Sequence, residues 1–366
     1  MRLFRCQVCG QVLHFENTRC ERCGSNLGFL PGSATLSALE RDGRAWRALA
    51  QPEGRFRFCA NAGPEACNWL IPARSPESLC QSCRHNRVIP DLGVPENQLP
   101  WRRWEMAKHR LVYTLLRLRL PMPTRAQDPE GGLAFDILAD AEGSPQVMTG
   151  HDNGLITLAL AEAEDAERER RRVAMGEPYR TLLGHVRHET GHFYWDRLVR
   201  LGGKLEAFRR RFGDERQDYA MALQRHHAEG PPAAWQERFV SAYATAHPWE
   251  DFAESWAHYL HMLDTLEMAA ALEFSVQPRA DTTGVLRAEI VFDPYAEQDF
   301  TALVDAWVPL THAVNSLNRC MGAPDIYPFV LAPPVIEKLA FIHDLVRANQ
   351  ATPCTTRGRP ALQPTA

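Results

Sequence analysis

The pentapeptide His188-Glu-Thr-Gly-His192 sets the tightest limit on how this chain of 366 residues can fold. Apolar residues at helical spacing precede and follow it, so the pentapeptide is predicted to lie in the middle of a helix. There the two histidines lie one turn apart on one face. Such a pair can present two ring nitrogens to one zinc ion, while Glu189 reaches a water molecule at an open position of that ion. The predicted chemistry is metal-assisted hydrolysis.

Gly191 stands inside this predicted helix, where glycine costs about 1 kcal/mol relative to alanine. A glycine tolerated at that cost often marks a place where another segment approaches the backbone closely. The alternative interpretation is that the two histidines are ordinary core residues of an amphipathic helix. The downstream sequence favours the metal site, because a catalytic zinc ion needs a third protein ligand and a candidate follows.

Residues 248–261 form a second predicted helix that offers this third ligand. Pro248 suits the first turn of a helix, and aromatic and aliphatic residues then recur at helical spacing. Glu250 and Glu254 lie four residues apart, so both carboxylates point the same way. One of them can bind the metal while the other accepts the N–H of a ligating histidine, which fixes the tautomer of that histidine.

An HExxH motif followed by a helix with Glu-x-x-x-acid resembles the gluzincin metallopeptidases, in which the first carboxylate of the second helix binds the metal. The resemblance implies that Glu250 is the ligand and Glu254 its supporting partner, with the reverse assignment as the alternative. Residues 250–254 are also similar to the equivalent helix of anthrax lethal factor, where a tyrosine seven residues before the ligand faces the metal. Tyr243 stands at that offset. It could donate a hydrogen bond to an oxyanion, or equally could be a helix-packing residue.

Two CxxC pairs stand near the N-terminus, Cys6 with Cys9 and Cys20 with Cys23, with ten residues between the pairs. This is the spacing of a zinc ribbon, in which four thiolates hold a closed tetrahedral site. Disulfide pairing is the alternative. It is disfavoured because the chain shows no secretory feature, and structural disulfides are rare in reducing compartments.

A second cysteine cluster follows, with the spacing C-x7-C-x12-C-x2-C at Cys59, Cys67, Cys80 and Cys83. It predicts a second zinc site, with His85 as a substitute ligand for Cys59 or Cys67. Buried free thiols are the alternative. The isolated Cys320 is expected to be a small core residue, and Cys354 to lie in a loose tail.

The order of these features, with a predicted helix at 101–116 between the cysteines and the HETGH and EDFAE segments, resembles bacterial zinc-binding metallopeptidases with an N-terminal zinc ribbon. The likeness extends to about residue 345. It implies an α+β fold, with one or two zinc ribbons followed by a zincin-like metalloprotease domain made of a small antiparallel or mixed sheet, active-site helices and a helical C-terminal part.

The expected domains are a zinc-ribbon region at 1–95, a zincin-like domain at 96–349 and a disordered tail at 350–366. Prolines at 90, 95 and 100 are expected to mark a linker before the 101–116 helix. Strands are expected at 134–138, 146–148 and 154–160, the last of them forming the sheet edge to which a peptide could add as one more strand. Helices are expected at 300–317 and 334–348.

Charge and hydropathy narrow the classes of partner. Residues 1–90 hold 12 Lys or Arg against 7 Asp or Glu, and the remainder holds 29 against 38. A basic ribbon could bind nucleic acid or an acidic protein, and protein docking or structural support is favoured because the excess is mild. The charged run at 162–172 is expected to be a solvated helix or loop, with a substrate-selecting loop as the alternative. No apolar stretch approaches the length of a membrane helix and no signal peptide is apparent, so a cytoplasmic protein is expected.

These observations predict a zinc-dependent metallopeptidase with one catalytic Zn²⁺ and one or two structural zinc ions. His188, His192 and Glu250 are expected to hold the catalytic ion, and Glu189 to move the proton of water to the leaving amine. Two other classes stay open. One is a zinc hydrolase of a non-peptide amide. The other is a zinc-ribbon adaptor for nucleic acid or protein, whose metal site is closed by a fourth protein ligand from His185, His247 or His258.

Overall fold

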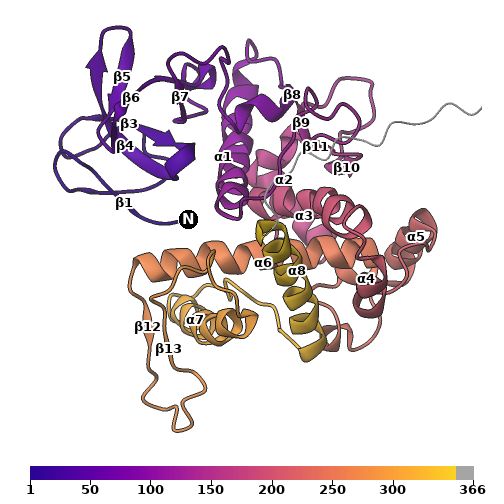
Figure 1. The fold of residues 1–366 in the computed structure, drawn as a ribbon. Helices are drawn as coiled ribbons and strands as arrows, with labels where there is room; N and C mark the ends of the chain where they lie inside the picture. The colour runs from indigo at the N-terminus through magenta and orange to yellow at the C-terminus, as the bar shows by residue number, and fades with distance from the viewer. Residues whose placement is uncertain (352–366) are drawn as a thin grey trace, which may run out of the picture.

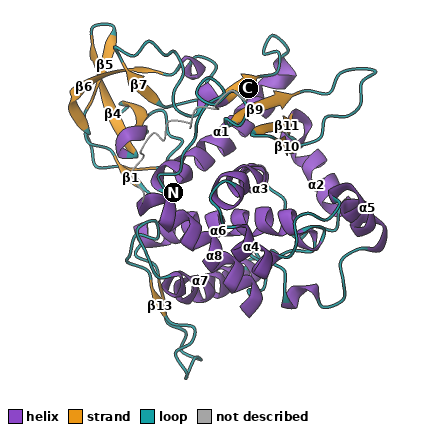
Figure 2. Ribbon diagram, turned by 45° about the vertical axis from the view of Figure 1, so that its right-hand side comes forward, coloured by secondary structure: helices purple, strands orange, loops and turns teal. Residues whose placement is uncertain are grey.

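The computed structural model of the chain describes residues 1–351 (Figure 1). The predicted tail at 350–366, Cys354 included, lies outside the described residues apart from its first two, which end the last helix. The fold is mixed α+β, as the sequence predicts. Small sheets with the cysteines lie towards the N-terminus, and helices dominate the rest (Figures 1 and 2).

The N-terminal part contains a short hairpin and a five-stranded antiparallel sheet. The hairpin pairs β1 (Phe4–Arg5) with β2 (Val12–Leu13), and the sheet runs in chain order through β3 (Asn26–Leu30), β4 (Thr35–Asp42), β5 (Ala45–Ala48), β6 (Gln51–Phe58) and β7 (Leu70–Pro72). Gly43, with φ of +61°, allows the two-residue turn between β4 and β5. Phe29 and Trp69 pack in the core of this part, with ring centroids 4.7 Å apart.

A second, four-stranded sheet covers the helical part, in the order β10 (Gly150–Asp152), β11 (Leu155–Ala159), β9 (Ala134–Leu138) and β8 (Asn86–Val88). Strands β8, β9 and β11 are parallel, and β10 runs antiparallel to β11. Two expectations are wrong here. Residues 146–148 form no strand, and the strand near 154–160 is internal, because β10 pairs with its free side. The Asn153-Gly154 turn, where both φ angles are positive, creates this hairpin and makes β10 the edge.

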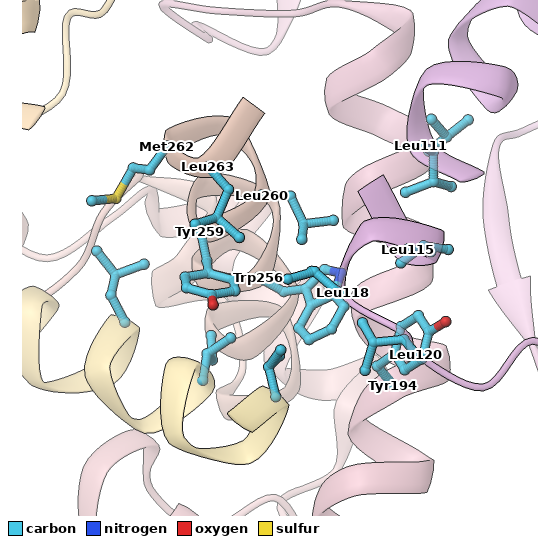
Figure 3. Packing of buried hydrophobic residues seen from close by; sticks show 14 of the residues in the cluster. Leu111, Leu115, Leu118, Leu120, Tyr194, Trp256, Tyr259, Leu260, Met262 and Leu263 are labelled. Carbon is cyan, nitrogen blue, oxygen red and sulfur yellow. The ribbon is translucent and has the colours of Figure 1, made fainter. Parts of the chain in front are cut away.

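Helix α1 (Pro95–Arg117) lies between the N-terminal sheets and the other long helices (Figure 1). It begins earlier than expected, so the proline linker is shorter. Pro95 occupies the first turn, where its missing N–H costs nothing. Leu111 and Leu115 face the main core with Trp256 and Leu260 (Figure 3), whereas Leu116 packs against the cysteine-rich part.

Two helices carry the candidate residues. Helix α3 (Leu182–Tyr194) begins at its N-cap Thr181, whose side chain accepts the N–H of Gly184, and a π-helical turn follows it at Trp195–Arg200. Helix α6 (Pro248–Ala271) is capped by the His247 side chain and crosses beneath α3 (Figure 2). Its buried side chains include Phe252, Trp256 and Tyr259, which join the main core.

The remaining elements surround this pair. They are α2 (Asp165–Ala174), α4 (Leu205–Phe212), α5 (Tyr219–Glu229), the short strands β12 (Ser275–Val276) and β13 (Ala288–Glu289), α7 (Phe300–Cys320) and α8 (Pro333–Ala351). Cys320 is exposed, so the core position expected for it is wrong, because it ends α7 on the solvent side. The charged run is helical but only partly solvated, since Glu162 and Arg171 are buried. Among the described residues, none of the helices is long and apolar enough to cross a membrane.

Candidate metal centre

Helices α3 and α6 touch at Gly191. A Cβ atom at this position would lie 2.8 Å from the Cα of Ala253 on α6, closer than real carbon contacts allow. Only glycine fits, as its place inside a helix predicts. The close approach lets side chains within one turn of Gly191 on α3 meet side chains from the first two turns of α6.

His188, His192 and Glu250 meet at this crossing. Nε2 of His188 lies 3.0 Å from Oε2 of Glu250, and Nε2 of His192 lies 3.5 Å from Oε1. One ligand atom from each residue lies within 4.8 Å of the others. Bonds of about 2.05 Å to a tetrahedral zinc ion would separate ligand atoms by about 3.3 Å, which matches these distances. The Glu250 carboxylate is 1% exposed, and its Oε2 has no hydrogen-bond donor among the described residues. A buried anion of this kind needs a cation.

Glu254 contacts the Nδ1 side of the His188 ring. Its Oε1 accepts a hydrogen bond of 2.6 Å from Nδ1 of His188, which leaves the lone pair on Nε2 directed towards Glu250. Burial lowers the pKa of His188, but its interactions with the carboxylates of Glu250 and Glu254 outweigh this and raise the pKa overall. The structure thus places the two carboxylates at different nitrogens of one ring.

The His192 ring is oriented by packing. Its centroid lies 3.9 Å from that of Trp249, and the His151 ring on β10 stacks at 5.8 Å with an interplanar angle of 27°. The Nδ1 atom of His192 has no partner among the described residues. Trp249 and His151 were not predicted as site residues, since neither belongs to a motif with a metal-ligand spacing.

Glu189 lies on the same helix between the two histidines and is 9% exposed. Burial raises its pKa, and the charges of His188 and His192 offset this only in part. It is the only carboxylate of the HETGH motif, and it is absent from the group of three whose atoms could bind one ion.

Two tyrosines face the centre from the segment between α4 and α6. The Tyr243 ring lies 5.9 Å from the His188 ring. The Tyr219 hydroxyl, which sequence analysis missed, donates a 2.6 Å hydrogen bond to Oε1 of Glu250. Burial, together with the charge of Glu250, raises the pKa of both hydroxyls, so both are hydrogen-bond donors at neutral pH. Tyr219 precedes Glu250 by 31 residues and begins a separate helix, so no spacing rule identifies it.

The three histidines that could have closed the site are engaged elsewhere. Nδ1 of His185 lies 2.8 Å from Oε2 of Glu162, Nε2 of His247 lies 3.2 Å from a backbone carbonyl, and Nδ1 of His258 lies 2.9 Å from a tyrosine hydroxyl. Within residues 1–351 the group at the crossing therefore has three candidate protein ligands and no fourth.

The eight cysteines predicted to bind zinc form two groups of four. In each group the sulfur atoms lie within 4.8 Å of one another. The separations are 3.7 Å for Cys6 with Cys23, 3.6 Å for Cys9 with Cys20, and 3.8 Å for Cys67 with Cys80. Zinc–sulfur bonds of about 2.3 Å in a tetrahedron give about 3.8 Å, whereas a disulfide would need about 2.05 Å. Both groups therefore fit a closed zinc site.

Cys59 and Cys83 complete the second group, and His85 does not enter it. Backbone N–H groups donate to the sulfur atoms of this group. The backbone nitrogen of Cys80 lies 3.3 Å from the sulfur of Cys59, and that of Cys83 lies 3.4 Å from the sulfur of Cys80. The His85 ring turns away, with Nδ1 2.9 Å from the carbonyl oxygen of Leu133. The suggested substitution of His85 for a cysteine is wrong, because all four thiols already converge.

Comparisons with known proteins match both parts of the chain. A zinc-ribbon domain model matches residues 3–94. Three uncharacterised mycobacterial proteins, one from Mycobacterium bovis and two from strains of Mycobacterium tuberculosis, are 44% identical to the chain over 349 residues, covering 94% of this chain and 95% of each relative. No solved structure matches. The model of the "putative zinc-binding metallo-peptidase" family matches residues 97–345, and the chain belongs to this family.

Proposed function

We propose that the chain is a zinc-dependent peptidase that hydrolyses peptide bonds at the crossing of α3 and α6. The observation that carries this proposal is the convergence of His188, His192 and Glu250, with Glu189 beside them and no fourth protein ligand among the described residues. A structural zinc site would be closed by four protein ligands. The family to which the chain belongs supports the same activity.

In this proposal each residue has a separate task. A zinc ion held by His188, His192 and Glu250 would supply a Lewis acid that polarises the substrate carbonyl and makes water more acidic. Glu189 accepts the proton of the attacking water and transfers it to the nitrogen of the leaving amine. Tyr243 donates a hydrogen bond to the carbonyl oxygen as that atom gains negative charge. Glu254 keeps the His188 ring in one tautomer.

The substrate in this proposal is an extended peptide that pairs with β10. This strand is an edge of the four-stranded sheet, and its His151 stacks on the ligand His192. An edge strand offers unpaired backbone groups to a peptide, and main-chain hydrogen bonds then supply affinity with little dependence on sequence. A non-peptide amide would use the same metal centre without this pairing, so matched peptide and small-amide substrates separate the two classes.

The ribbon region would hold two structural zinc ions and dock a protein partner or substrate. Eight cysteines in two thiol groups, none of them in a disulfide in the structure, fit a reducing compartment such as the cytoplasm. Nucleic acid is the alternative partner, because the ribbon region carries a mild positive charge.

The substitution Glu189→Gln tests the proposal. It removes the proton acceptor but no proposed ligand, so peptidase turnover is expected to fall about 100-fold or more while the zinc content stays unchanged. Glu53→Gln, at an exposed position of the N-terminal sheet, serves as the control and should behave like the wild type. Full peptidase activity in Glu189→Gln would contradict the assignment.

A further inference from the structure

Helix α5 reaches the metal centre through its first residue. The helix begins after its N-cap Asp218, whose side chain accepts the N–H of Met221, and Ala222 is the one side chain that it buries. Despite this loose attachment, Tyr219 directs its hydroxyl to the buried Glu250. Its ring also packs edge-on against His247 at 5.3 Å and Trp249 at 5.7 Å.

The hydrogen bond from Tyr219 divides the two oxygens of Glu250 between different tasks. Oε1 accepts the tyrosine O–H at 2.6 Å. Oε2, 3.0 Å from Nε2 of His188, has no donor among the described residues. A carboxylate held at one oxygen by a neutral donor can bind a cation through the other, and it cannot rotate freely about its last bond. Single-oxygen binding also keeps a coordination position open.

We propose that Tyr219 is a positioning residue that fixes Glu250 as a one-oxygen metal ligand, which makes α5 part of the metal centre. The inference rests on the metal site of the proposed function but not on peptidase activity. Tyr243 is the natural comparison, because its ring lies against His188 at 5.9 Å and no hydrogen bond joins it to Glu250. The two tyrosines therefore predict different defects when each loses its hydroxyl.

Zinc affinity of the His188–His192–Glu250 site provides the test. The site is identified as the zinc equivalent that is lost in His192→Ala, and its affinity is measured by competition with a chelator. Tyr219→Phe is expected to weaken zinc binding by about 10-fold to 100-fold, the usual cost of losing a partner of a ligand. Tyr243→Phe is expected to stay within about threefold of the wild type, since the Tyr243 hydroxyl makes no hydrogen bond to Glu250.

Cobalt provides a second readout. After mild chelation the site is loaded with Co²⁺, and its visible absorption reports the arrangement of the ligands. The band is expected to change in Tyr219→Phe and to stay the same in Tyr243→Phe. Wild-type zinc affinity together with a wild-type cobalt spectrum in Tyr219→Phe would overturn the inference, and so would equal losses in both tyrosine variants.

Folding and activity are controlled separately. Tyr219 is 37% exposed and the change removes one oxygen, so the fold should survive. If Tyr219→Phe does not fold, Asp218→Ala replaces it, because this change loosens the start of α5 and keeps the Tyr219 hydroxyl. Weakened zinc binding in Asp218→Ala supports the inference, and unchanged binding overturns it. A wild-type chain with no peptidase activity would contradict the proposed function alone. An active chain whose Tyr219→Phe variant binds zinc normally would contradict this inference alone.

Discussion

Gly191 shows how one residue can set the distance between two helices. The methyl group added by Gly191→Ala would lie 2.8 Å from the Ala253 backbone, so α3 and α6 must separate. The strain is expected to cost about 1–3 kcal/mol of unfolding free energy, which exceeds the gain of about 1 kcal/mol in helix propensity. Denaturant unfolding measures this. Gly32→Ala, where a Cβ meets nothing within 4 Å, should change stability by less than about 0.5 kcal/mol. A stabilised Gly191→Ala protein would show that the helices do not need this contact.

Glu250 and Glu254 are chemically alike but differ in what they touch. Glu250→Gln is expected to abolish zinc binding at the crossing, because it replaces the carboxylate that lies within 3.5 Å of both histidines. Glu254→Gln should keep the ion about 10-fold to 100-fold more weakly, since it weakens only the partner of His188. Zinc content after dialysis against a mild chelator measures both. The opposite order would make Glu254 the ligand.

The candidate residues differ in how far the sequence could reveal them. The spacing of His188, His192, Glu250 and Glu254 predicts that they act together, because helical periodicity determines which residues share a face. The choice of Glu250 over Glu254 as the ligand came from the resemblance to the gluzincins. Tyr219 could not be predicted from spacing, because its place beside Glu250 depends on the path of the chain between α4 and α6. Contacts that depend on such a path have no signature in local spacing.

Among the elements, helices were predicted more accurately than strands. Strong apolar periodicity located α3, α7 and α8 closely and the start of α6, which runs to Ala271 instead of ending near residue 261. The strands β3 to β7 were not predicted, because residues untypical of strands interrupt their pattern, such as Pro52 and Gly54 in β6. The β10–β11 hairpin did carry a signal, the Asn153-Gly154 dipeptide, and giving that signal weight would have identified the edge strand.

Glu162 joins three elements and makes their association depend on pH. Its carboxylate contacts Arg171 of α2, His185 of α3 and Arg180 at 2.8–3.1 Å. Burial alone would raise its pKa, but the hydrogen bonds and charges of His185 and Arg180 lower it from 4.5 to about 2. A lowered pKa in the folded chain stabilises it above pH 4.5, and this contribution is lost as pH falls towards 2.

The comparison of wild type with Glu162→Gln tests this dependence. At pH 7 the variant is expected to be less stable by roughly 3 kcal/mol, and the difference should shrink as pH falls below 4.5. Denaturant unfolding across that range measures the difference, and any acid loss of zinc is common to both proteins. Glu169→Gln, at an exposed ion pair with Arg172, should show a much smaller trend, because solvent screens that pair. A difference that stays constant with pH would contradict the role of the charge.

The ribbon and the helical body are joined through the second cysteine group. Cys83 is buried against α1, with its sulfur 3.5 Å from Nε2 of His109 and 3.7 Å from the Glu105 carboxylate, which pairs with the buried Lys108. Cys23, in the first group, is exposed. Loss of metal at the second group should therefore affect both parts of the chain.

A pair of cysteine variants tests this link. Cys83→Ser is expected to lower the unfolding free energy by more than about 3 kcal/mol and to increase amide hydrogen exchange in α1, because metal binding and folding are coupled there. Cys23→Ser should raise exchange mainly within residues 1–25. Equal protection of α1 in the two variants would show that the second group does not support the body.

Anomalous X-ray diffraction at the zinc absorption edge, on crystals of the unmodified chain, tests whether His188, His192 and Glu250 hold a zinc ion. It should show an ion about 2.0–2.2 Å from Nε2 of His188, Nε2 of His192 and a Glu250 oxygen, with a position left for solvent or substrate. A crossing without an ion in zinc-loaded crystals, or an ion held there by a fourth protein side chain, would contradict the account.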